Sequence, residues 1–187
     1  AIGLNALYNN QANANTAVGT QALQSNTTGS PNDAFGYQAL TSNTTGVNNV
    51  AVGYQSQYSN TTGQGNTAIG YSALKANTVN DNTAVGINAL TANTTGTENT
   101  AVGSVALIAN TTGSYNVAVG RLCMYQNTTG ANNAAVGWAA LYSNTTGVSN
   151  TAIGYKAGYG LTTGSQQTIV GYNTATNLTT GSNGVYV

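Results

Sequence analysis

The feature that most constrains this chain is a short motif, Ala followed by Val or Ile and then Gly, that returns every 17 residues. Only two steps between the glycines of this motif (the anchor glycines) are 16 residues long, Gly3 to Gly19 and Gly70 to Gly86. A fixed period of this length is typical of a solenoid, in which each repeat buries its apolar side chains against its neighbours. The anchor glycines are Gly3, Gly19, Gly36, Gly53, Gly70, Gly86, Gly103, Gly120, Gly137, Gly154 and Gly171.

The repeat reads Asn-Thr-Ala-Val-Gly-Tyr-x-Ala-Leu-x-x-Asn-Thr-Thr-Gly-x-x. A β-branched residue and glycines in every repeat disfavour helix, and Asn-Thr-Thr-Gly is typical of a turn. We therefore expect an all-β fold, a parallel β-solenoid (β-roll) of about eleven 17-residue coils. Each coil is predicted to hold two short strands, one over Thr-Ala-Val-Gly-Tyr and one around Ala-Leu. Both 16-residue steps lose their residue in the turn, which predicts that length varies there and not in the ladder.

Two apolar columns run through the repeats, Val or Ile before the anchor glycine and Leu four residues after it. Strand alternation places Val or Ile on one face and Ala and Gly on the other. We expect the Val/Ile and Leu columns to form a thin core. The smooth Ala/Gly face must be covered, either by the opposite wall of the same coil or by another chain, and we favour another chain, in a trimer. End-to-end stacking into a filament is the alternative, because open solenoid ends expose strand edges.

Asparagine recurs four residues before and seven residues after the anchor glycine. Amides stacked about 4.8 Å apart can hydrogen-bond from one coil to the next, so we expect asparagine ladders at the corners. The glycine that ends Asn-Thr-Thr-Gly is predicted to adopt a positive φ angle.

Charge is nearly absent, with three basic residues, three acidic residues and no histidine. A chain with no net charge has no basic face for nucleic acid or for a membrane surface. Without histidine, and with its carboxylates far apart in sequence, the chain is expected to be no enzyme and to bind no metal or cofactor. No stretch reaches the roughly 18 apolar residues of a membrane span, so we expect no membrane insertion in this segment. Cys123 replaces an alanine of the repeat and is expected to be buried.

Three surface features are candidates for binding. The first is an aromatic row directly after the anchor glycine, which could present a surface for sugars or simply pack within its own ladder. The second is the double threonine of the turn, since regular threonine arrays on flat solenoids bind ice in several antifreeze families. The third is Asn-x-Thr, which is a glycan acceptor pattern or a structural corner. The aromatic row is Tyr37, Tyr54, Tyr71, Trp138, Tyr155 and Tyr172; the possible glycan acceptors are Asn26, Asn43, Asn60, Asn93, Asn110, Asn127, Asn144 and Asn177.

The repeats are regular over residues 1–154 and vary over 155–187. In the variant part, Gly158 and Ala175 occupy the leucine position, and Leu161 and Leu178 replace asparagine. We interpret residues 155–187 as a transition towards a further domain. Because the chain begins inside a repeat and shows no signal peptide, we expect it to be a fragment of a longer chain.

The Asn-Thr-Ala-Val/Ile-Gly segment with its following Ala resembles the Asn-Ser-Val-Ala-Ile-Gly repeats in the heads of YadA-like trimeric autotransporter adhesins. The Ala-Val-Gly-Tyr-x-Ala-Leu and Asn-Thr-Thr-Gly segments are similar to repeats of bacterial and phage tail-fibre proteins. The resemblance implies a left-handed trimeric β-roll that is extracellular, on a cell surface or on a virion. The 17-residue unit is longer than the autotransporter repeat, and Thr stands where that repeat often has Val.

The sequence thus predicts a structural fibre segment, a shaft or head, of an extracellular adhesin or tail-fibre-like protein that mediates attachment. Its partners would be further copies of itself and a cell-surface glycan or protein receptor. The alternatives are an extracellular filament or matrix protein without a specific ligand, and an ice-binding solenoid.

Overall fold

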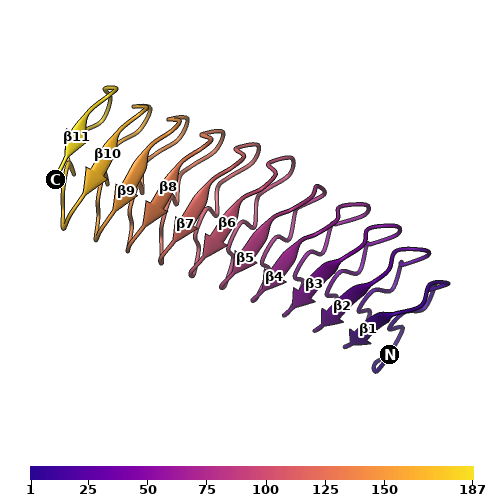
Figure 1. The fold of residues 1–187 in the computed structure, drawn as a ribbon. Coiled ribbons are helices and arrows are strands. Elements are labelled where there is room, and N and C mark those ends of the chain that lie inside the picture. Colours follow the sequence, from indigo (N-terminus) through magenta and orange to yellow (C-terminus); the bar gives the residue numbers. More distant parts are fainter.

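The protein is a rod of stacked coils, as the computed structural model of all 187 residues shows (Figure 1). Each coil contributes one short strand, and the strands form a single parallel sheet in sequence order. The chain forms no helix, and therefore none that is long and apolar enough to cross a membrane. The strands are β1 (Asn15–Val18), β2 (Asn32–Phe35), β3 (Asn49–Val52), β4 (Thr67–Ile69), β5 (Thr83–Val85), β6 (Thr100–Val102), β7 (Val117–Val119), β8 (Ala134–Val136), β9 (Thr151–Ile153), β10 (Thr168–Val170) and β11 (Val185–Tyr186).

Like residues lie over like throughout the sheet, which confirms the predicted β-solenoid. Ala101 of β6 pairs with Ala118 of β7, one repeat further along the chain. The register also holds across a 16-residue step, where Ala68 of β4 pairs with Ala84 of β5. The turn absorbs the missing residue, because the carbonyl of Val79 accepts the side-chain amide bonds that a turn glycine accepts in other coils. Length therefore varies in the turn and not in the ladder, as predicted.

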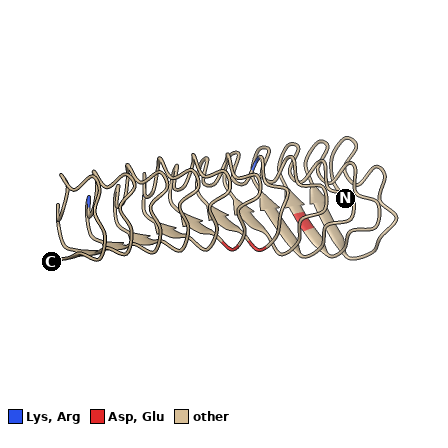
Figure 2. Ribbon diagram, turned by 90° about the horizontal axis from the view of Figure 1, so that it is seen from above, with Lys and Arg blue, Asp and Glu red and all other residues tan.

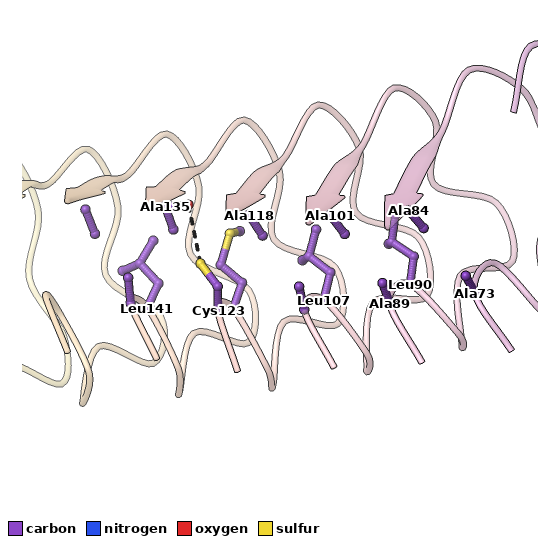
Figure 3. Close-up of a cluster of buried hydrophobic side chains, with 14 of the residues drawn as sticks. Ala73, Ala84, Ala89, Leu90, Ala101, Leu107, Ala118, Cys123, Ala135 and Leu141 are labelled. Carbon is purple, nitrogen blue, oxygen red and sulfur yellow. Dashed lines mark hydrogen bonds between the residues drawn. The ribbon is translucent and has the colours of Figure 1, made fainter. Parts of the chain in front are cut away.

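The inward face of each strand carries alanine, not valine. Ala101 is fully buried, whereas Ile69 and Ile153 are 40% and 46% exposed. The leucine column points inward as predicted and faces these alanines across the coil (Figure 3). A leucine from the opposite wall leaves space for only a methyl group on the strand. The predicted assignment of faces was therefore wrong: the Ala/Gly face lies inside the coil and cannot pack against another chain.

The segment after the anchor glycine is a series of turns, so the predicted second strand was also wrong. Ala89 and Leu90 are adjacent in sequence and both fully buried, which a strand does not allow because successive side chains point to opposite faces. Both side chains can point inward because the backbone is left-handed at the leucine, where φ is +50° in Leu90 and Leu107. One strand and one wall of turns therefore enclose the core.

The glycines serve different purposes from those predicted. The anchor glycines have the positive φ angles, for example +134° in Gly103, a region that side chains rarely enter. The turn glycines do not share this conformation. Gly130 is required by close approach, because a Cβ there would lie 2.6 Å from the carbonyl oxygen of Gly147 and 2.9 Å from the side-chain nitrogen of Asn144.

A polar rung divides the core into two clusters, one of seven and one of 19 buried apolar residues. Ser56 and Gln57 occupy the alanine and leucine positions of this rung and are fully buried. The Gln57 side-chain nitrogen donates to the carbonyls of Val50 (2.9 Å) and Asn66 (3.2 Å), while its oxygen has no partner.

The sheet continues through the variant residues 155–187, since β9, β10 and β11 pair in register. Compensating substitutions fill this part of the core. A Cβ on Gly158 would lie 2.9 Å from the Cδ1 of Ile169 and 3.0 Å from the Cδ2 of Leu141. Ile169, which replaces a strand alanine, thus occupies space that a leucine at position 158 would need.

Candidate functional site

The asparagines form two ladders inside the coil. After the anchor glycine, the Asn110 side-chain nitrogen donates to the side-chain oxygen of Asn93 (2.8 Å) and to the carbonyl of Gly113 (2.9 Å). Before the anchor glycine, the Asn99 side-chain nitrogen donates to the same Gly113 carbonyl (2.8 Å). Turn carbonyls therefore join both ladders and fix the turn from inside, except at Gly164, which accepts from Asn150 alone because Leu161 replaces the second asparagine.

These bonds involve the predicted glycan acceptors. Seven of the eight are fully buried. In each of them, the side-chain nitrogen that would carry the sugar donates a hydrogen bond within the coil. The folded coil leaves no room for a sugar on them, and their role is structural; only Asn177 is exposed. The buried acceptors are Asn26, Asn43, Asn60, Asn93, Asn110, Asn127 and Asn144.

The first threonine of most turns also donates a hydrogen bond to the next coil; Thr61 is the exception. The hydroxyl of Thr111 donates to the carbonyl of Thr128 (3.1 Å), and that of Thr128 donates to the carbonyl of Thr145 (3.1 Å). The second threonine is exposed, as at Thr112 and Thr129. The two threonines of a turn thus differ in their hydrogen bonding.

The outer face of the sheet carries two exposed or half-exposed columns. The Val/Ile column makes an apolar stripe along the rod. The column two residues before it holds threonine at six positions, valine or alanine at three and Asp33 at one. The stripe is Val18, Phe35, Val52, Ile69, Val85, Val102, Val119, Val136, Ile153 and Val170. Its neighbour is Thr16, Asp33, Val50, Thr67, Thr83, Thr100, Val117, Ala134, Thr151 and Thr168.

The aromatic row predicted from the sequence forms two separate stacks. In the first, the ring centroids of Tyr37 and Tyr54 are 5.5 Å apart and those of Tyr54 and Tyr71 are 4.9 Å apart. In the second, Trp138 stacks on Tyr155 (4.9 Å), and Tyr172 follows at 5.1 Å from Tyr155. The rings are within 14° of parallel in every pair. The faces of the inner rings are therefore covered, and mainly their edges and hydroxyl groups point outward.

A third aromatic stack lies beside that of Trp138, five residues after the anchor glycine. Tyr142 lies 5.1 Å from Tyr125 and 4.8 Å from Tyr159, centroid to centroid. Sequence reasoning missed it, although tyrosines 17 residues apart directly after the leucine position are a signal that would have revealed it.

The stack that begins at Trp138 and the stack that begins at Tyr125 meet at Lys156. Its side-chain nitrogen lies 5.2 Å from the ring centroid of Tyr159, 5.4 Å from that of Trp138 and 5.7 Å from that of Tyr155. These distances are typical of cation–π interactions. We call this group the C-terminal aromatic patch; it consists of Tyr125, Trp138, Tyr142, Tyr155, Lys156, Tyr159 and Tyr172.

The few charges are separated around the coil. All three basic residues, Lys75, Arg121 and Lys156, follow an anchor glycine by one to five positions and so lie on the wall of turns. The acidic residues belong to the strand or to the corner before it, and Figure 2 shows them along the strand side of the rod. The wall that carries the aromatic stacks therefore has only positive formal charge.

Cys123 lies in the core, where its thiol donates to the carbonyl of Ala135 (3.3 Å; Figure 3). Burial raises the pKa of this thiol to about 12, so it is protonated at neutral pH. The structure contains no group of three His, Cys, Asp or Glu side chains that could hold a metal ion, and no pocket.

Comparison with models of protein families, with curated proteins and with solved structures gives no match to this chain.

Proposed function

We propose that this chain is a rigid shaft or head of an extracellular attachment fibre, on a cell surface or a virion. It would resemble the YadA-like adhesin heads and tail-fibre repeats to which its motifs are similar. The observation that carries the proposal is the apolar stripe on the outer face of the sheet, which runs the length of the rod. Soluble monomers rarely leave a continuous apolar surface of this extent uncovered.

The partner that best fits this stripe is a second and third copy of the same chain, in a homotrimer with parallel rods. Parallel copies would place Val/Ile columns against one another at the same rung spacing. The near absence of charge favours such packing, since a single acidic residue, Asp33, lies in the outer columns. A thin core without disulfides buries little apolar surface, and lateral packing of the rods would add to the free energy of unfolding.

Sedimentation equilibrium tests the assembly. The wild-type chain is expected to sediment as a trimer, and Ile69→Asp combined with Ile153→Asp is expected to give monomers with an unchanged far-UV circular dichroism spectrum. Thr112→Asp together with Thr129→Asp, which place the same charge on the exposed turn, should leave the trimer intact. A wild-type chain that remains monomeric at high concentration would refute lateral assembly, whereas open-ended polymers would favour the alternative of a filament or matrix protein.

A second candidate, ice binding, is favoured by the outer face of the sheet and not by the turn threonines. Thr67, Thr83 and Thr100 lie on successive rungs beside the Val/Ile column, so hydroxyl and methyl groups repeat at the rung spacing. Thermal hysteresis that is abolished by Thr83→Tyr would support this function. No hysteresis in the monomeric Ile69→Asp, Ile153→Asp variant and in the wild type would exclude it.

A further inference from the structure

We propose that the C-terminal aromatic patch, together with Arg121, binds an acidic oligosaccharide that carries carboxylates. This inference rests on the proposed attachment function and specifies the class of receptor that the fibre recognises. It is carried by the convergence of two aromatic stacks on Lys156 and by the position of Arg121 one rung before Trp138, at the end of the Trp138 stack.

The two cations are spaced for a ligand longer than one sugar ring. Arg121 follows Gly120 and Lys156 lies two residues after Gly154, so they are two rungs apart, about 10 Å at the usual strand spacing. Trp138 lies on the rung between them. An oligosaccharide along the rod axis would therefore place one carboxylate near each cation and a sugar ring against the indole.

One ring face of Trp138 is not covered by another aromatic ring. It is the first ring of its stack, so Tyr155 covers one face, and the next residue on the other side is Arg121. The apolar face of a sugar packs well on such a surface. The phenol hydroxyls of the patch add hydrogen-bond donors and acceptors along the path of the chain.

Lys156 is held in place before any ligand arrives. The three rings around its ammonium group restrict the side chain, which lowers the entropy cost of placing the charge on a ligand. The ammonium group has three hydrogen-bond donors, and cation–π contacts leave them free for carboxylate oxygens. Arg121 is exposed and offers a planar fork that matches a carboxylate.

The rest of the rod lacks this combination. The stack of Tyr37, Tyr54 and Tyr71 has no cation over its rings, and Lys75 lies 5.9 Å from the single ring of Tyr58. No acidic residue lies on the wall of turns, so the cations of the patch have no competing partner there. The N-terminal stack and Lys75 therefore provide matched internal controls.

The experiment uses the single tryptophan of the chain, Trp138, as a reporter inside the patch. Oligogalacturonate is titrated into the full chain while tryptophan fluorescence is recorded, with fully methyl-esterified oligogalacturonate as the uncharged control. A saturable change is expected with the acid form only. Lys156→Gln and Arg121→Gln should each weaken binding about tenfold, the loss of one charge-assisted hydrogen bond, while Lys75→Gln should leave it unchanged.

Three results would overturn the proposal: no saturable change, equal binding of the methyl ester, or equal weakening by Lys75→Gln. Equal binding of polyglutamate would show general attraction of anions and would also overturn it. Circular dichroism of each variant verifies that the coil is intact. Sedimentation of the same samples reports assembly independently, so a trimer that fails to bind the sugar refutes this inference alone, and a monomer that binds refutes lateral assembly alone.

Discussion

The space inside each coil accommodates one leucine side chain and, opposite it, one alanine side chain. Where the sequence departs from this pair, either a second substitution fills the space or a buried polar atom is left without a hydrogen-bond partner. Ile169 compensates for Gly158, but Leu161, which replaces an asparagine, leaves the side-chain oxygen of Asn144 buried and without a partner. Gln57 leaves a second such oxygen in the core.

Replacing Gln57 by leucine is expected to stabilise the protein. The leucine would join the two core clusters and remove a buried oxygen that lacks a partner. It would also remove the two bonds from the Gln57 nitrogen to backbone carbonyls, so the net gain in the free energy of unfolding is expected to be about 1 kcal/mol. Its backbone, with φ of +49°, matches that of the leucines in this column. Urea unfolding followed by circular dichroism measures the change, and the exposed Gln64→Leu serves as control. A lower midpoint for Gln57→Leu would contradict the proposed defect.

The buried thiol of Cys123 predicts a specific loss of stability at alkaline pH. Its pKa is raised from 9.0 to about 12 in the folded state, so the thiol stabilises the fold fully below pH 9, and this contribution is lost as the pH rises towards 12. Cys123→Ala, which restores the usual residue of the column, should therefore lose less stability between pH 8 and pH 10.5. Urea midpoints of both proteins at the two pH values test this, because the two proteins differ in this side chain alone. An equal decline would show that the thiol is not the cause.

Among the elements of the fold, the wall of turns differs most from what the sequence suggests. Each coil contains left-handed residues at fixed positions, including the exposed corner before the strand asparagine, where φ is +56° in Glu98 and +58° in Ser149. This conformation costs residues other than glycine about 1–2 kcal/mol each. At this corner Gly65 adopts the conformation without that cost, and Pro31 is not left-handed.

Ser149→Gly is therefore expected to raise the free energy of unfolding by about 1 kcal/mol, the strain relieved less the extra entropy of glycine in the unfolded chain. The backbone bond from the nitrogen of Ser149 to the carbonyl of Ala131 (3.0 Å) is available to either residue. Ser149→Ala keeps the strain and should change little. Thermal unfolding of the three proteins would show this order, and a destabilised glycine variant would argue against strain at the corner.

The repeat period was sufficient to predict the solenoid, the leucine column and the asparagine ladders, because stacking places equal positions above one another. Alternation in Thr-Ala-Val separated alanine from valine but did not reveal which faces inward. That choice depends on the width of the coil, which Leu90 and its equivalents set from the opposite wall. The left-handed leucines were also unpredictable, since only glycine and asparagine signal this conformation in a sequence. The aromatic row was predicted as a set of residues, whereas its meeting with Tyr159 at Lys156 depends on how the wall of turns folds.

For the whole molecule, the dominant property is that each strand contacts only its neighbours in sequence. Stability is then close to a sum over rungs and their interfaces. The molecule has no long-range contact that fixes the number of coils.

Deletion of one complete repeat, residues 104–120, is therefore expected to yield a folded rod that is shorter by about 4.8 Å. Small-angle X-ray scattering measures the length, and circular dichroism should show an unchanged signal per residue. Deletion of residues 104–111 alone is the control, because it shifts inward positions outward and should prevent stacking downstream. If the whole-repeat deletion unfolded the chain, the rungs would not be independent units.

The asparagine ladders, which fix the turns of the regular repeats from inside, have a consequence for the outside of the rod. Because the buried amides stabilise the shape of the coil, side chains that point to solvent contribute little to the free energy of folding. They can therefore differ from coil to coil. Surface positions thus repeat about every 4.8 Å along the axis. Binding residues can be introduced, removed or moved to another coil without changes to the buried residues.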